Sequence, residues 1–433
     1  MKYILNIIIL LISYNIAWGQ EIINFKAAVE KALLNNYSIR IAKESNKIAD
    51  NNVSPGNAGM LPKIDIVGGY NYTNQDIYIV MMTGQRIEQA GNIAKSVNAA
   101  VQLSWTLLDD MGMFISYERL KSLKSKSDIE LKISVENTVK DISNTFLNAL
   151  LLKRNLDVLQ ESIELSRHRL KRIEDRLDYG VSNSVEILKA RVDLNTDSAN
   201  FMRTELNYRN SLRMLKFLMG VSSDMQITPD TNINFINFKS LEEYRNSARK
   251  SNASILQAVK NKEITELEHE LLQTNYMPKL NFTASYSYQR SDADAGFLLI
   301  NQNIGLATGL NLSWNIFDGL KTNIQSQNNK ISSEINSITI EMLRSQIDMA
   351  VINNYEAFSE KKKILDMDIA NLEAAESNYR KSKDLYESGQ ISSVELREAQ
   401  LNLSRAKMRI NESLIDAKHS ETELNILSGT LSY

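Results

Sequence analysis

Two pairs of segments alternate between apolar and polar residues, the pattern of a β-strand with one apolar face. In 64–73 the apolar and aromatic residues take the even positions, and in 96–107 they take the odd positions. Segments 280–289 and 303–316 repeat this arrangement. The pattern predicts two β-hairpins, at about 63–107 and 279–317, each with one apolar and one polar face.

The segments that follow each hairpin are patterned as long helices. About 70 residues in 109–179, and again in 318–388, contain no proline, and at 1.5 Å per residue each helix could reach ~100 Å. Apolar residues recur every seven positions in both segments, which predicts helices supercoiled against neighbours. The residues are Ile142, Ala149, Leu156, Ile163, Leu170 and Leu177, then Val351, Phe358, Leu365, Leu372, Tyr379 and Tyr386. Shorter helices are expected at 24–59, 184–220, 240–277 and 393–429.

These elements come twice in the same order. A constant spacing of 209 residues relates three pairs of motif residues: Trp105 and Trp314, Gly180 and Gly389, and Gly220 and Gly429. The duplication predicts a first structural repeat at 20–221 and a second at 222–433, each with a helix, a β-hairpin, a long helix and another helix. Pro62 and Pro278 are offset by seven further residues, so we expect an insertion that lengthens the loop around 81–94.

The composition narrows the class of protein to which the chain can belong. The 433 residues include only 4 Pro and no Cys, and the net charge of −2 argues against a nucleic-acid-binding protein. Residues 1–19 join Lys2 and an apolar run at 4–12 to Ala17-Trp18-Gly19, which predicts a signal peptide and a mature chain from about Gln20. After export, the lack of Cys excludes a lipid anchor and disulfides.

Alternating strands could form either a soluble sheet with one wet face or a membrane β-barrel. The signal peptide, the strand length and aromatic residues near strand ends favour the barrel. The predicted aromatic belt contains Tyr70, Tyr72, Trp105, Tyr286, Tyr288 and Trp314. Four strands cannot close a barrel, since about eight are needed, so several chains are expected. Two chains would leave no room for water, whereas three would supply twelve strands and room for a lumen.

Where each long helix turns back, a glycine is followed by a helix start. Gly180 and Gly389 can adopt the left-handed conformation that ends a helix. Residues 183–186 and 392–395 then resemble capping boxes for the returning helices, the first with Asn in place of Ser or Thr. These segments predict two helix-hairpin tips.

Acidic residues follow the second tip. Glu395 and Glu398 are three apart and share a helical face, so a ring of chains would gather several carboxylates there. Lys189 and Arg397 would weaken that acidic field. The alternative is that the glutamates only cap and solvate the helix.

The other polar residues do not indicate a catalytic, metal-binding or phosphate-binding site. The run 167–172 is interpreted as a solvated helix face, and the three histidines lack metal-ligand spacing. No nucleophile has a base at a recognisable spacing, and no phosphate-binding loop is present. We therefore expect no catalytic, cofactor or metal site, and no enzyme.

The duplicated Pro-led strand, the Leu-Ser-Trp strand before Asp109 or Asp318, and the two Gly-x4-Val-Glu tips together resemble the TolC-like outer membrane efflux proteins. The resemblance covers about 22–429. It implies a mainly α-helical homotrimer, with a twelve-stranded β-barrel in the outer membrane joined to a trimeric α-barrel tunnel through the periplasm. It also implies an exit duct for a tripartite pump or type I secretion, with a periplasmic adaptor and an inner-membrane pump as partners.

By motif position, the family's entrance acids correspond to Glu395 and Glu398, with Glu186 in the first copy, and its gate tyrosine to Tyr386. The first copy has Leu177 in the tyrosine's place, and heptad packing is the alternative role for Tyr386. Adaptor docking is expected at the tips: Gly180, Val181, Ser182, Gly389, Gln390 and Ile391. At the entrance positions this chain has Glu where the family commonly has Asp. It also lacks the lipidated N-terminal Cys that many relatives carry.

Two other classes stay open. The chain could be a periplasmic coiled-coil adaptor whose strands form a soluble sheet, or an exported structural protein without a pore. Its cargo is not evident from any residue pattern.

Overall fold

The computed structural model describes residues 21–179, 183–235, 238–296 and 298–429. It divides into two compact units, and each takes segments from both predicted repeats. The strand unit comprises Ser45–Asp128 and Gln257–Ile340. The helix unit comprises the described residues up to Glu44, Ile129–Leu256, and those from Glu341 onward. The division into sequence repeats stays a prediction.

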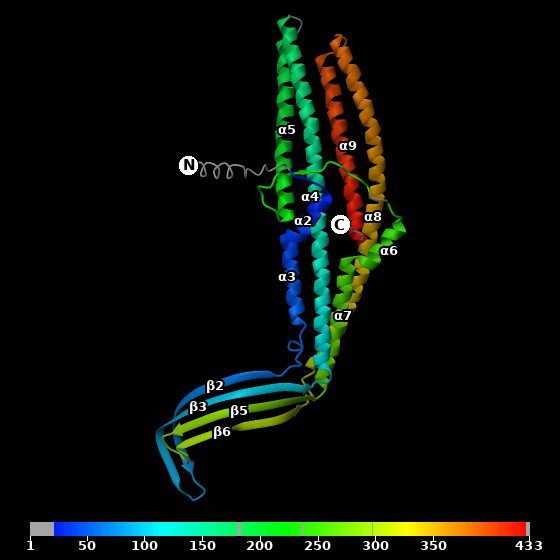
Figure 1. The fold of residues 1–433 in the computed structure, drawn as a ribbon. Coiled ribbons are helices and arrows are strands. Elements are labelled where there is room, and N and C mark those ends of the chain that lie inside the picture. Colours follow the sequence, from blue (N-terminus) through cyan, green and yellow to red (C-terminus); the bar gives the residue numbers. More distant parts are fainter. Residues whose placement is uncertain (1–20, 180–182, 236–237, 297, 430–433) are drawn as a thin grey trace, which may run out of the picture. The chain divides into compact units, whose positions relative to one another are not determined.

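The strand unit contains one antiparallel sheet in the order β2-β3-β5-β6 (Figure 1). The strands are β2 (Lys63–Val80), β3 (Arg86–Leu108), β5 (Lys279–Ala293) and β6 (Ile300–Ser313). Apolar residues meet across strands on one face, as in the pair Tyr70 and Val97, and polar residues meet on the other, as in Asn71 and Ser96. The alternation seen in the sequence therefore gives this sheet one apolar and one polar face.

The seven extra residues of the first hairpin lengthen its strands. The turn between β2 and β3 takes only residues 81–85, whereas residues from Arg86 onward belong to β3. The expectation of a longer loop around 81–94 is therefore wrong. The second hairpin is shorter at its end than the pattern suggested, because β6 stops at Ser313.

Two helices span both units and are 67 residues long, α4 (Gly112–Asp178) and α8 (Lys321–Glu387). The shorter helices are α2 (Phe25–Asn35), α3 (Tyr37–Asn52), α5 (Ser184–Met219), α6 (Leu241–Ser251), α7 (Ala253–Gln273) and α9 (Ser393–Leu427), with a short 3-10 helix at Thr274–Tyr276. The long helices confirm the expected coiled-coil class: Ile142, Ala149, Val351 and Phe358 are all buried.

Polar contacts connect the helices of the strand unit pairwise. The three contacts join α3 to α4, α4 to α7, and α7 to α8. They are Asn46 to Asp128 at 2.8 Å, Arg119 to Glu268 at 2.7 Å, and Asn336 to Thr265 at 2.9 Å. These contacts leave α3 and α8 as the two ends of a series of four helices.

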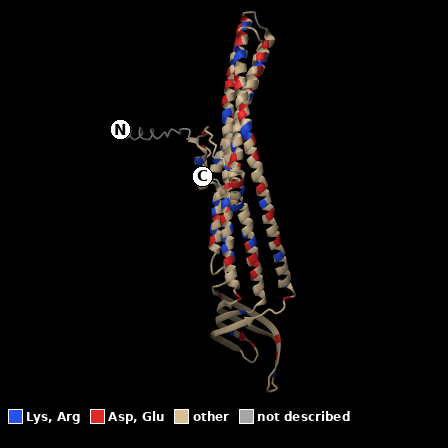
Figure 2. Ribbon diagram, turned by 90° about the vertical axis from the view of Figure 1, so that its right-hand side faces the viewer, with Lys and Arg blue, Asp and Glu red and all other residues tan. Residues whose placement is uncertain are grey.

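In the helix unit, β1 (Glu21–Ile23) pairs in parallel with β4 (Ile227–Pro229) beside an apolar core. The core includes Ile23, Val29, Ile142, Leu215 and Met219. Helix α5 ends at Met219 and is capped by Gly220, whose φ of 65° is left-handed. Charged residues of both signs alternate along the helices, and few lie on the four long strands (Figure 2).

Among the helices within the described ranges, none combines the length and the apolar character that crossing a membrane requires.

Candidate functional site: the helix-hairpin tips

The two helix hairpins, α4–α5 and α8–α9, end in turns whose returning helices are capped. At the second tip, Gly389 has a left-handed φ of 76°. The Ser392 hydroxyl accepts a hydrogen bond from the Glu395 backbone N–H, and the Glu395 carboxylate accepts one from the Ser392 backbone N–H at 2.7 Å. At the first tip the Asn183 side chain accepts a hydrogen bond from the Glu186 backbone N–H at 3.1 Å.

The predicted docking residues of the first tip, Gly180, Val181 and Ser182, lie outside the described residues. In the second tip, Gln390 is exposed and Ile391 is half-buried. The backbone N–H of Gln390 donates to the Leu385 carbonyl at 2.8 Å, which closes the end of α8. Docking at either tip stays a prediction.

The three candidate entrance acids differ in their surroundings. Glu395 accepts hydrogen bonds from the Ser392 backbone N–H and hydroxyl, and these hold the pKa of Glu395 below its ordinary value. Glu398 is exposed on the following turn, and Glu186 is half-buried. Glu395 therefore acts as a cap, while the ring of acids stays a prediction.

Tyr386 lies between the ends of α8 and α4. Its side chain is buried, and the guanidinium carbons of Arg172 and Arg176 lie 5.9 Å from the ring centroid. Arg172 also pairs with Glu387 at 2.9 Å. The Tyr386 hydroxyl is buried and has no hydrogen-bond partner among the described residues. These contacts are those of a packed heptad residue, and the gate role stays a prediction. Leu177, its counterpart, is 36% exposed.

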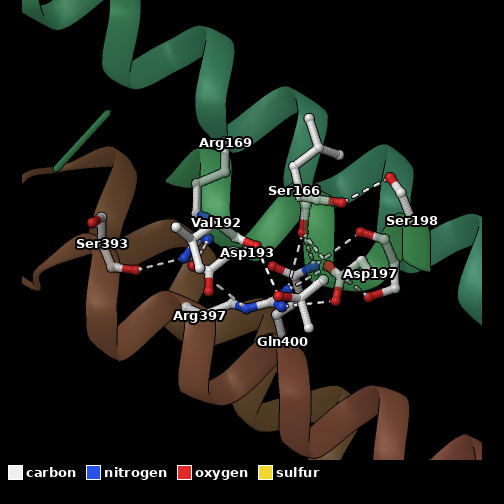
Figure 3. A network of polar contacts seen from close by, with 12 residues as sticks. Ser166, Arg169, Val192, Asp193, Asp197, Ser198, Ser393, Arg397 and Gln400 are labelled. Atoms are coloured by element: carbon white, nitrogen blue, oxygen red, sulfur yellow. Dashed lines mark hydrogen bonds and ion pairs between the residues drawn. The ribbon is translucent and has the colours of Figure 1, made fainter. Parts of the chain in front are cut away.

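A buried polar network lies close to the tips in sequence (Figure 3). Arg397 of α9 donates two hydrogen bonds to the Asp197 carboxylate of α5, both at 2.8 Å. The two side chains are only 9% and 6% exposed. The Ser166 hydroxyl of α4 donates to Asp197 at 2.6 Å, and the Gln400 amide donates to Ser166. The network therefore joins three helices that come from both hairpins.

A second ion pair extends this network. Arg169 of α4 pairs with Asp193 of α5 and also donates to the Ser393 carbonyl at 3.3 Å. Arg169 is buried, although its neighbours Arg167 and His168 are exposed, so the interpretation of 167–172 as a solvated face is wrong for Arg169. The charge of Arg397 is likewise paired inside the helix layer, with Asp197, and its influence on an acidic field stays a prediction.

A groove of about 460 Å³ lies beside the network, between α5 and α9. Its apolar lining includes Val185, Leu188, Val192 and Val394, which are exposed by 55% or more. Lys189 also lines it and is exposed. The tips therefore offer an open apolar surface whose lining also includes side chains of both charges, among them Lys189 and Glu186.

The six predicted belt aromatics lie on or just after the strands, where all except Tyr288 are 40% to 63% exposed. The Trp105 indole donates to the Met60 carbonyl, and the Trp314 indole donates to the Tyr276 carbonyl, both at 2.9 Å. Trp105 thus holds the segment that leads into β2, and Trp314 holds the segment that leads into β5. The belt itself stays a prediction. In the described part of the chain, no three His, Asp or Glu side chains are grouped so as to hold a metal ion.

The sheet and the paired long helices give this chain the fold of bacterial outer membrane channels. The structure of the Campylobacter jejuni CmeC outer membrane channel matches with a TM-score of 0.77 at 16% identity, covering 94% of this chain and 85% of that one. The open state of the Neisseria gonorrhoeae MtrE outer membrane channel matches with a TM-score of 0.71 at 14% identity, covering 94% and 91%.

The family follows from the sequence match. The pattern of the outer membrane efflux protein family matches residues 28–221 and 244–430, and the chain belongs to this family. Outer membrane protein TolC of Vibrio cholerae serotype O1 is 26% identical over 208 residues, which are 47% of this chain and 45% of that protein. The match therefore spans less than half of that relative's length.

Proposed function

We propose that the chain is the exit duct of a tripartite efflux or type I secretion system, a passive conduit made by three copies across the periplasm and the outer membrane. Family membership supports this, and one observation on the chain itself carries it. Both the sheet and the helix series end in edges that the described residues do not cover.

The sheet has two open edges, β2 and β6. An exposed edge strand presents unpaired backbone N–H and C=O groups, and closure into a barrel removes such edges. Four strands are too few, since a filled barrel needs about eight. We propose that β6 of one copy pairs with β2 of the next, giving twelve strands in a ring of three. The apolar face with Tyr70 and Tyr72 would then contact outer membrane lipid, and the polar face would line the duct.

The two end helices of the series, α3 and α8, also have exposed apolar surfaces. On α8, Ile324, Ile331 and Ile338 lie seven residues apart and are 55%, 55% and 60% exposed. On α3, Ile41 and Ile48 are also seven apart and are 67% and 63% exposed. Sevenfold spacing of apolar residues is the pattern of a coiled-coil seam. We propose that the α8 seam packs against α3 of the next copy, a head-to-tail contact that closes a ring.

The ring is testable because the chain contains no cysteine. Ile48→Cys combined with Ile331→Cys should give covalently linked dimers and trimers with a short bismaleimide. The control combines Ile48→Cys with Lys330→Cys, whose side chain is exposed and points about 100° away from the seam. Equal linking in both variants, or none in either, contradicts the ring.

The duct itself is tested by location and conductance. The protein should fractionate with the outer membrane, and the purified oligomer should conduct in a planar bilayer. Recovery in a soluble periplasmic extract would favour a coiled-coil adaptor. A membrane-inserted oligomer without conductance would favour a structural protein.

The tips suit two further roles. We propose that the groove lined by Val185, Leu188 and Val394 receives a periplasmic adaptor, which connects the duct to an inner-membrane pump. We also propose that Glu398 contributes most to a cation-sensitive entrance, because Glu395 is engaged in its cap. Glu398→Ala should reduce block by divalent cations more than Glu395→Ala does, and unchanged block in both variants leaves these residues as helix-capping and solvated groups.

A further inference from the structure

The β2–β3 hairpin continues beyond the rest of its sheet as a two-stranded ribbon, residues 75–93 (Figure 1). The pairing of β3 with β5 reaches only to Ala94, so β5 does not cover the ribbon. Its apolar residues lie on both faces. Ile77, Ile79 and Ile87 on one face are half-buried, and Tyr78 and Val80 on the other are 60% and 54% exposed. Apolar side chains on a ribbon that reaches past its sheet leave apolar surface available to a contact partner.

A β-bulge marks the base of the ribbon. The pairing passes from Gln75 with Asn92 to Ile77 with Gln89, so β3 has one residue more than β2 here. Gly91, within the bulge, has a left-handed φ of 66°, and its backbone N–H donates to the Asp76 carboxylate at 2.7 Å. These contacts fix the geometry with which the ribbon leaves the sheet.

The ribbon also anchors to the neighbouring hairpin. Asn92 is buried, and its side-chain oxygen accepts a hydrogen bond from the Ala295 backbone N–H at 2.8 Å. The Asp294 backbone N–H donates to the Ile93 carbonyl at 3.0 Å. The base of the ribbon is therefore held against the turn between β5 and β6, and its position is defined.

The apolar side of the ribbon lies on the sheet's polar face. Side chains alternate along β2, so Ile77 and Ile79 project from the same face as Gln75 and Asn71. Ile79 pairs directly with Ile87. The face that is largely polar along the sheet thus becomes apolar beyond the bulge, where Ile77, Ile79 and Ile87 lie together.

The other face of the ribbon changes in the opposite sense. It continues the sheet face that bears Tyr72, yet it pairs Tyr78 with Glu88 and Val80 with Arg86. Glu88 and Arg86 make this face of the ribbon the more polar of the two, although Tyr78 and Val80 belong to it. The apolar patch consequently lies on the side that would face the axis of the proposed ring.

We propose that Ile77, Ile79 and Ile87 pack against the same residues of neighbouring copies and close the outer mouth of the duct with an apolar seal. The occupant of the patch is a second copy of this chain, because in a closed ring the equivalent ribbons are what the axial face meets. This inference rests on the proposed ring of three copies.

Cross-linking on the two faces of the ribbon tests the seal in full-length protein in whole cells. Ile79→Cys should form disulfide-linked dimers at least fivefold more than Val80→Cys, which lies one residue away on the opposite face. A membrane-impermeant maleimide should label Ile79→Cys at least fivefold more slowly under reducing conditions. Ile79→Asp should raise conductance at least twofold, with no change for Val80→Asp.

The outcomes separate the seal from the ring. If Ile48→Cys with Ile331→Cys links the copies but Ile79→Cys forms no dimers, the seal is overturned and the ring stands. Slow labelling of both thiols without dimers would also overturn it, because that result places the ribbon in the outer lipid leaflet. Failure of the Ile48 and Ile331 linkage would refute the ring itself.

Discussion

The buried pair of Arg397 and Asp197 gives the most direct test of what holds the two helix hairpins together. Arg397→Met keeps much of the aliphatic stem and removes both hydrogen bonds to the Asp197 carboxylate. Among the described residues, the hydroxyls of Ser166 and Ser162 would then remain as donors to the buried Asp197 carboxylate. Removing one partner of a buried pair costs about 3–5 kcal/mol, and the remaining hydroxyls favour the lower value, about 3 kcal/mol.

Hydrogen exchange is a suitable assay because it measures the free energy of local opening in the assembled protein. A loss of about 3 kcal/mol should accelerate amide exchange in the adjoining turns of α5 and α9 by roughly 150-fold. Lys407→Met is the matched control on α9. Lys407 pairs with Glu161 of α4 at 2.6 Å, but these side chains are 25% and 47% exposed. Its removal should cost less than about 1 kcal/mol.

Removing both buried charges completes the test. Asp197→Leu with Arg397→Leu should restore exchange to within about 1 kcal/mol of the unmodified protein, because no isolated buried charge remains. If Arg397→Met and Lys407→Met accelerate exchange equally, or if the double variant is as labile as the single one, the explanation by an unpaired buried charge is refuted.

Two further predictions concern the helix ends. Because the pKa of Glu395 is lowered in the folded protein, its cap stabilises α9 above the ordinary carboxyl pKa and is lost as pH falls through the lowered value; exchange at the start of α9 should accelerate on acidification, and Glu395→Gln should abolish that pH dependence. A Cβ at Gly220 would lie 2.4 Å from the Asn35 carbonyl oxygen, whereas one at Gly389 would meet nothing within 4 Å. Gly389→Ala should therefore cost only the left-handed backbone strain, about 1 kcal/mol, and Gly220→Ala more than about 2 kcal/mol, as measured by thermal unfolding of the two variants.

The strands and long helices could be predicted because their periodicity reflects local geometry. Alternation along 64–73 follows from one apolar sheet face, and the sevenfold recurrence through Ile142 and Val351 follows from coiled-coil packing. The ends of elements depend on weaker signals. Residues 86–93 continue a strand because Gly91 permits a bulge, although the repeat offset alone suggested a loop.

The buried network could not be predicted in the same way. Arg169 lies in a basic run and Arg397 among glutamates, so both looked solvated. Their partners, Asp193 and Asp197, are at least 24 residues away in sequence, and only helix packing brings them together. One signal was present: Asp193 and Asp197 are four apart and share a helical face. That spacing indicates paired acids on one side of α5 without identifying their partners.

The order of strands in the sheet has a consequence for how the chain folds. β2 with β3 and β5 with β6 are local hairpins, but the central partners β3 and β5 are about 170 to 200 residues apart in the sequence, from Leu108 with Leu280 to Ala94 with Ala293. Pairings of such high contact order form slowly, because a long loop must close before the contacts stabilise it. Until α4 and α5 and the segment after them have been delivered, the first hairpin exposes an apolar face and an open edge. The interval before the second hairpin arrives is therefore the stage at which a newly exported chain is most exposed to aggregation and proteolysis.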